Sequence, residues 1–154
     1  QSVDTSSLMI EQYATDLRFR NVQIPQGSLI KSATLKICSH STGLTGDLNG
    51  AIYAEDADDA ADFSTRKIPQ LPRTEAFEPW VWGSDAPWTA GTWYESPELA
   101  HVVQEVVDRP GWSADNAMVL IFWTTSYAGS DRRIWAYEGS PDTAARLVIT
   151  YQPQ

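Results

Sequence analysis

Short runs in which apolar and polar residues alternate constrain the fold of this chain more than any other feature. In residues 17–22, Leu17 and Phe19 fall on one face of an extended strand, and two arginines fall on the other. Residues 31–38 alternate in the same way. A period of two is typical of a strand with one buried face. The two runs therefore predict antiparallel strands that either pair with each other or face each other across a sandwich.

Apolar runs bounded by turn residues predict further strands at 51–54, 118–124, 132–138 and 145–151. Proline and glycine mark the turns between strands, as at Pro25 to Gly27. Many short strands with a single helix indicate an all-β fold, an antiparallel β-sandwich of jelly-roll type. The 154 residues fit one module, which we expect to span 1–154.

One short amphipathic helix is predicted near 97–108. Ser96 suits the N-cap, and Pro97 suits the first helical position. Arg109-Pro110-Gly111 ends the helix. Between these signals the apolar residues recur on one helical face, and they are Leu99, Val102, Val103, Val106 and Val107.

The charge of the chain limits its partners. It has 20 acidic residues against 11 Lys and Arg, a net charge of −9. Such a surface repels phosphate, and no cluster of basic residues offsets it, so no nucleic-acid partner is expected. No apolar stretch approaches the ~20 residues that cross a bilayer, so no membrane partner is expected either. The single cysteine, Cys38, is expected as a buried apolar residue.

Sequence signals for catalysis are weak. The chain contains no G-x-S-x-G, no H-E-x-x-H and no phosphate-binding glycine loop. His101 precedes Glu105 by four residues on the predicted helix, which favours a surface pair. We therefore expect a non-enzyme. A small glycan-cleaving domain with two paired carboxylates is the third interpretation, and the 20 acidic residues single out no pair.

The aromatic residues favour a function. Seven Trp and six Tyr stand against two His and two Met. Sugars pack their C–H faces on flat aromatic rings. Alternation in the strand from Arg132 places Trp135 and Tyr137 on one face, and the segment 63–94 has no regular period but several tryptophans. The candidate carbohydrate-binding residues are Trp80, Trp82, Trp88, Trp93, Tyr127 and Trp135, with Arg133 as a polar anchor.

The same rings allow a second interpretation, in which they close the core. Trp112 follows the helix end and Trp123 shares a face with Val119 and Ile121, so we assign these two tryptophans to the core. If the other rings are buried too, the chain is a structural or protein-interaction spacer without a glycan ligand.

An acidic run suggests a metal site. Oxygen ligands on a loop suit Ca²⁺, whose charge relieves the repulsion between carboxylates. The spacing does not match an EF-hand. The candidate ligands of a structural calcium ion are Glu55, Asp56, Asp58, Asp59 and Asp62, with Glu138 as an addition from another strand. A solvated acidic turn without metal is the alternative.

A few cations stand out in this acidic chain. If the early strands alternate as predicted, Arg18, Arg20 and Lys36 gather on one face. A row of this kind can bind a carboxylate or a sulfate, which keeps acidic polysaccharides beside neutral ones as candidate ligands. Cross-strand pairing of these cations with Asp or Glu is the alternative, and we favour it.

Several segments resemble the β-sandwich modules of large secreted bacterial proteins. They are residues 17–27, 30–35, 52–58, 96–112, 137–139 and 145–151. The helix exit Arg109-Pro110-Gly111-Trp112 is the most specific of these matches. The chain is similar to DNRLRE-type domains, which are non-catalytic jelly rolls appended to surface proteins and polysaccharide-degrading enzymes. Some of them bind polysaccharide, and many have no assigned ligand.

The resemblance implies a secreted, extracellular module that is tethered to other domains of a larger protein and binds polysaccharide. By analogy with other sugar-binding jelly rolls, it also implies a structural calcium ion at Glu55 to Asp58. The chain departs from the pattern by having aromatic residues at Trp93, Trp123, Tyr127 and Trp135. Extra rings on a shared scaffold fit a member specialised for glycan binding, but the sugar is not inherited. The site is expected on the sheet face or at the loop edge.

Overall fold

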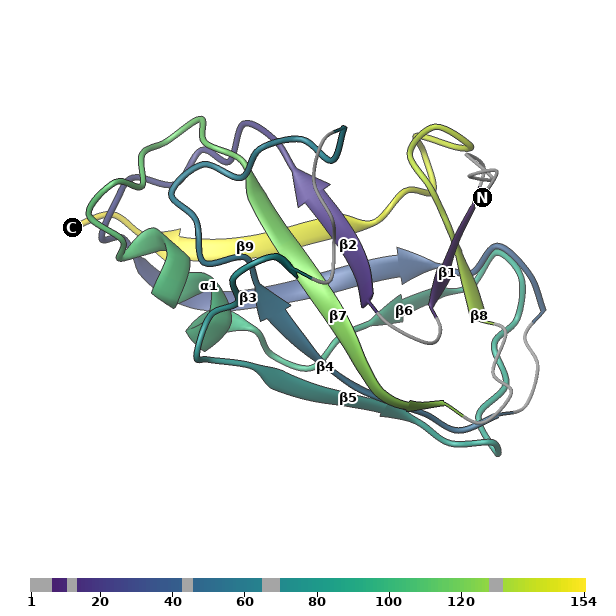
Figure 1. Ribbon diagram of the computed structural model, residues 1–154. Coiled ribbons are helices and arrows are strands. Elements are labelled where there is room, and N and C mark those ends of the chain that lie inside the picture. Colours follow the sequence, from purple (N-terminus) through teal and green to yellow (C-terminus); the bar gives the residue numbers. More distant parts are fainter. Residues whose placement is uncertain (1–6, 11–13, 43–45, 65–69, 128–131) are drawn as a thin grey trace.

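The computed structural model describes residues 7–10, 14–42, 46–64, 70–127 and 132–154, without the side chains of 7–10 and of Tyr127. Its elements, shown in Figure 1, are the strands and the helix in this chain order: β1 (Ser7–Ile10), β2 (Ala14–Phe19), β3 (Leu29–Cys38), β4 (Leu48–Ala54), β5 (Glu78–Trp82), β6 (Trp93–Glu95), α1 (Ala100–Val107), β7 (Met118–Tyr127), β8 (Arg132–Trp135) and β9 (Arg146–Gln152).

The strands form antiparallel sheets. One has four strands in the order β2-β7-β4-β5, another has three in the order β6-β3-β9, and β1 pairs with β8. In Figure 1, β7, β4 and β5 lie in front of β3 and β9, and α1 covers one end. This arrangement confirms the all-β antiparallel sandwich with one short helix. No helix in the described part of the chain is long and apolar enough to cross a bilayer.

The two strands predicted first lie in different sheets, because β2 pairs with β7 and β3 pairs with β9. They therefore face each other across the sandwich, which confirms the second of the two alternatives. Their apolar faces meet in one core, to which β3 contributes the buried side chains of Ala33, Leu35 and Ile37. Cys38 and Trp112 are also buried, as predicted.

The predicted row of cations does not form, because its members belong to different sheets. The Arg18 Nε–H donates to the Ala60 carbonyl at 2.8 Å. Lys36 Nζ lies 2.8 Å from a carboxylate oxygen of Glu95 on the neighbouring β6. The prediction of a shared basic face is thus wrong, and Lys36 makes the cross-strand pair that was the alternative.

Helix α1 begins at Ala100, later than predicted, because the residues expected to cap it bind β3 instead. Ser96 Oγ accepts a hydrogen bond from the Leu35 amide at 2.9 Å, and Glu98 Oε1 accepts one from the Ala33 amide at 2.6 Å. Strand β6 pairs with β3 only over Lys36–Cys38. The segment before α1 therefore satisfies backbone groups of β3 that have no neighbouring strand.

Strands β5 and β6 fall in the segment 63–94, in which the sequence shows no regular period. Both lie at sheet edges. Pro79 interrupts the pattern of β5 without ending it, because an edge strand has one side on which a missing N–H is tolerated. Short edge strands carry little periodic signal, so these two were not predicted.

Candidate ligand-binding cleft

An open cleft of about 1150 Å³ lies beside β2, the edge strand of the four-stranded sheet. Residues 16–21 line it from β2 and the two residues that follow, and residues 135–138 line it from the end of β8 and the connection to β9. In Figure 1 this connection is the yellow loop that joins the two strands. Asp62 and Phe63, at the end of the acidic run, also line the cleft.

Two aromatic rings of the cleft differ in how they are held. Trp135 is half-buried, and its ring meets that of His40 edge-on, with 4.4 Å between ring centroids. The His40 amide donates to the Arg133 carbonyl at 2.9 Å, which joins this loop to β8. Tyr137 follows in a turn and is 63% exposed. The cleft thus combines a supported ring with a freely presented one.

The charged groups among the described lining residues are three carboxylates and two guanidiniums, those of Asp16, Asp62, Glu138, Arg18 and Arg20. Within the described residues, Glu138 makes no hydrogen bond or ion pair and is exposed. Glu138 was predicted as a possible neighbour of the acidic run, and both it and Asp62 do line this cleft.

Trp80, Trp82 and Trp88 belong to the core. Trp80 is 8% exposed and Trp88 1%, while Trp82 is half-buried and packs edge-on against Trp88 at a centroid distance of 5.1 Å. The Trp88 ring stacks on Tyr94 at 4.9 Å. Trp80 and Trp88 are enclosed and have no free face for a ligand, so these two candidates close the sandwich instead. Trp82 packs against the same core but is only half-buried.

Arg132 supports this aromatic cluster and was not singled out from the sequence. It is fully buried, with its guanidinium 5.7 Å from the Trp88 ring centroid. Its Nη groups donate to the carbonyls of Gly46, Gly83 and Ala86. Burial lowers the pKa of Arg132. The only sequence signal was strand alternation, which places Arg132 on the inward face with Ile134.

The remaining candidates lie apart from the cleft. Trp93 is 37% exposed on β6, and the Arg146 guanidinium lies 4.6 Å from its ring centroid. Arg133 is half-buried and does not line the cleft. The side chain of Tyr127 lies outside the described residues. Of the six candidates whose side chains the structure describes, only Trp135 is brought to the cleft.

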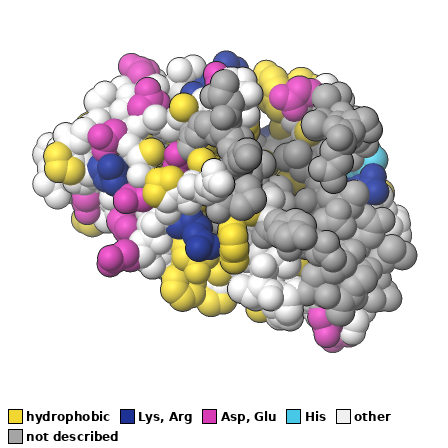
Figure 2. Space-filling model, in the orientation of Figure 1, with side chains coloured by type: hydrophobic (Ala, Val, Ile, Leu, Met, Phe, Trp, Pro, Cys, Tyr) yellow, Lys and Arg dark blue, Asp and Glu magenta, His cyan; other side chains and the backbone are white. Residues whose placement is uncertain are grey.

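Trp123 shares a face with Val119 and Ile121, as predicted, but this is the outer face of its sheet. Val119 and Ile121 are buried there in a second apolar cluster. Trp123 is half-buried, and the Arg73 guanidinium lies 4.1 Å from its ring centroid. Tyr53 is also beneath Arg73, at 5.0 Å. Figure 2 shows a group of hydrophobic side chains beside a basic one on this side of the molecule.

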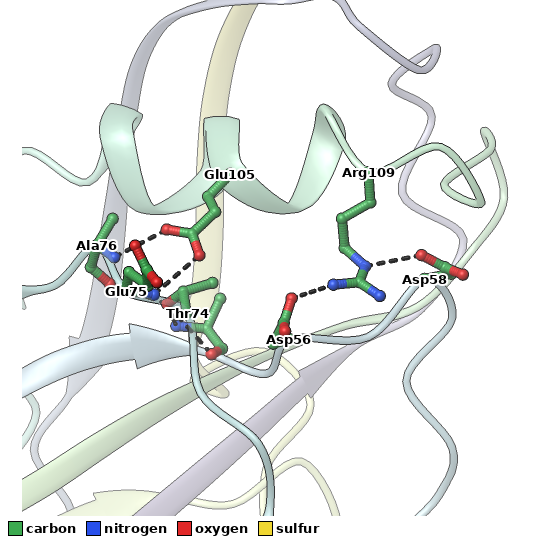
Figure 3. Close-up of polar contacts among 8 residues, drawn as sticks. Asp56, Asp58, Thr74, Glu75, Ala76, Glu105 and Arg109 are labelled. Carbon is green, nitrogen blue, oxygen red and sulfur yellow. Dashed lines mark hydrogen bonds and ion pairs between the residues drawn. The ribbon is translucent and has the colours of Figure 1, made fainter.

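The acidic run folds beneath α1 and contacts its exit. Figure 3 shows Asp56 and Asp58 turned toward Arg109, whose Nε–H donates to Asp58 at 2.7 Å and whose Nη1–H donates to Asp56. The hydrogen bond to Asp58 is the main cause that raises the pKa of Arg109. Glu105, one turn earlier, accepts hydrogen bonds from the amides of Glu75 and Ala76, both at 2.8 Å.

The five predicted calcium ligands therefore point to different partners. Asp59 Oδ1 accepts from the Ala117 amide at 2.8 Å, Glu55 is buried, and Asp62 lines the cleft. In the described ranges, no group of three or more His, Cys, Asp or Glu side chains is arranged to hold a metal ion. In this fold the Arg109 guanidinium lies between Asp56 and Asp58, so these two carboxylates have a cationic partner from the chain itself, and the calcium site stays a prediction.

Comparisons with known proteins add little. No family model matches the chain, and no curated protein does. A solved structure of a latent aurone synthase, a polyphenol oxidase from natural source, has a TM-score of 0.45 and 6% sequence identity. The similarity covers 93% of this chain and 25% of that one, so the chain spans about a quarter of that protein's length. A likeness this distant does not bear on function.

Proposed function

We propose that this chain is a non-catalytic module that binds polysaccharide in the cleft beside β2. The observation that carries the proposal is the exposure of the Tyr137 ring, 63%, at a cleft that also contains the Trp135 ring. A large exposed aromatic ring stabilises the fold little, since its apolar surface stays in water. It is well suited to pack against the C–H face of a sugar.

Polar groups beside the rings fit the same ligand. The cleft places carboxylates and guanidiniums next to Tyr137, and these groups accept from or donate to sugar hydroxyls. The cleft is open along the edge strand β2, which suits a long chain that enters and leaves. A secreted module tethered to other domains would use such a site to hold a larger protein on its polymer.

Affinity electrophoresis against neutral, uronate and sulfated polysaccharides tests this function. We expect at least one gel to retard the chain and Tyr137→Ala to abolish the retardation. Phe77→Ala is the matched control, because Phe77 is 46% exposed but lies outside the cleft, so its loss leaves retardation unchanged. Equal retardation of wild type and Tyr137→Ala, or no retardation in any gel, contradicts the proposal.

Trp135 provides a second test. We expect Trp135→Ala to abolish binding and to leave the Tm within a few degrees of wild type, because its ring lines the cleft and is only half-buried. Differential scanning fluorimetry and the same gels measure both effects. Unchanged affinity removes Trp135 from the site, and gross unfolding would assign it to the core.

A structural or protein-interaction spacer is the second candidate. The packing of Trp80, Trp82 and Trp88 inside the sandwich favours it, because these rings account for much of the tryptophan content without a ligand. A spacer predicts no retardation by any polysaccharide.

A further inference from the structure

Carboxylates outnumber guanidiniums among the described residues that line the cleft beside β2. Three of its side chains, Asp16, Asp62 and Glu138, are carboxylates, and two, Arg18 and Arg20, are guanidiniums. Arg18 is half-buried and its Nε–H is used by the Ala60 carbonyl. Arg20 is thus the one exposed cation among the described lining residues.

The rest of the molecule does not offset this charge. The net charge is −9, and Figure 2 shows acidic side chains spread over the end that carries α1. A polyanion that approaches the cleft meets repulsion from the exposed Glu138 carboxylate and from the field of the whole molecule. A polysaccharide without charged groups meets neither.

Glu138 gives the cleft an acceptor for hydroxyl groups. It follows Tyr137 directly in the turn after β8, and both residues line the cleft and are exposed. Within the described chain, no hydrogen bond or ion pair occupies the Glu138 carboxylate. A free carboxylate has two oxygens that accept hydrogen bonds, and hydrogen bonds to an ionised group are the stronger ones. Neighbouring hydroxyls at the edge of a sugar ring match that pair of acceptors.

We infer that the cleft selects a polysaccharide of uncharged sugar units, whose ring faces Tyr137 and whose adjacent hydroxyls donate to Glu138, and that it rejects uronate and sulfated polymers. This inference rests on the proposed function and narrows its ligand class. Because the contacts are apolar packing and hydrogen bonds to neutral hydroxyls, binding depends little on ionic strength.

The test uses four soluble probes, galactomannan and mixed-linkage β-glucan as neutral polymers, and polygalacturonate and chondroitin sulfate as polyanions. Affinity electrophoresis at low and high salt shows which class of polysaccharide binds, and isothermal titration calorimetry gives the affinity. We expect a neutral probe to retard the chain equally at both salt levels and neither polyanion to do so. Glu138→Gln should weaken neutral binding on the order of tenfold, since an ionised acceptor is lost. Asp85→Asn, an exposed carboxylate outside the cleft, is the matched control and should change nothing.

The outcomes separate the two proposals. Retardation by polygalacturonate or chondroitin sulfate that disappears in Tyr137→Ala overturns the inference and supports polysaccharide binding at the cleft. Retardation by no probe overturns both. Neutral binding that is unchanged in Glu138→Gln overturns the recognition by Glu138.

Discussion

Gly111 is the residue at which the helix exit and the acidic run come closest. A Cβ at this position would overlap Asp58 Oδ2, so only glycine leaves the carboxylate room to reach Arg109. Arg109 therefore binds the Asp58 carboxylate, and Gly111 leaves space for it. Trp112, the last residue of the segment, donates a hydrogen bond from Nε1 to the Ile24 carbonyl at 2.9 Å. The Arg-Pro-Gly-Trp segment is explained by these contacts.

We expect Gly111→Ala to destabilise the fold by about 1–3 kcal/mol, because the added methyl must displace Asp58. Urea unfolding measures the change. The control is the same substitution in an Asp58→Ala background, where the clash is absent and the cost should fall. An equal cost in both backgrounds would show that Asp58 is not the cause.

Metal removal tests the acidic run in another way. Arg109 forms ion pairs with Asp56 and Asp58, so its guanidinium offsets part of the negative charge of the acidic run. We expect EDTA to leave both the Tm and the retardation by polysaccharide unchanged. Added Ca²⁺ should increase neither the Tm nor the retardation. A lower Tm in EDTA that Ca²⁺ restores would establish the calcium site that the resemblance implied.

Residue types alone do not tell which tryptophans are exposed. The alternation of β8 predicted that Trp135 and Ile134 face opposite ways, and their burial agrees. Trp80, Trp82 and Trp88 come from a segment without a period, so their burial depends on a sheet and a buried arginine that only the folded chain brings together.

At the level of elements, local and long-range signals compete before α1. Ser96, Pro97 and Glu98 have the pattern of a helix start, and the sequence predicted one there. The Ser96 hydroxyl binds the backbone of β3 instead, and Glu98 Oε1 accepts from both the Ala33 amide of β3 and the Ala100 amide at the start of α1. The strands predicted at 31–38 and 145–151 were located to within two residues, whereas the one predicted at 17–22 lies three residues earlier, as β2. Contacts between distant segments, such as Glu98 with Ala33, leave no local pattern in the sequence.

The hydrogen bond between Ser96 and β3 gives a testable prediction. Ser96 is buried, so Ser96→Ala leaves the Leu35 amide without its acceptor, at a cost of about 1–3 kcal/mol. Ser113→Ala is the control, because Ser113 is exposed and its hydroxyl binds only an adjacent carbonyl. Urea unfolding compares the two variants. Equal midpoints would mean that the contact between Ser96 and β3 contributes nothing.

At the level of the whole molecule, β2 is the edge strand of its sheet in the described part of the chain, and the connection between β8 and β9 lies beside it. The fold class followed from strand alternation and turn residues. The cleft did not, because its walls come from strands of different sheets and from a loop, and their meeting depends on how the sheets pack. Of this cleft, the sequence predicted only that Trp135 and Tyr137 share one face of a strand.

The central claim is that polysaccharide binds at this cleft. An amide-resolved NMR titration with neutral oligosaccharides, cut from galactomannan, tests it most directly. The account predicts that the shifts that change belong to residues 16–21, 62–63 and 135–145, which contain the lining of the cleft. Changes confined to the surroundings of Trp93 or of Trp123, or a spectrum that stays the same up to saturating sugar, would contradict it.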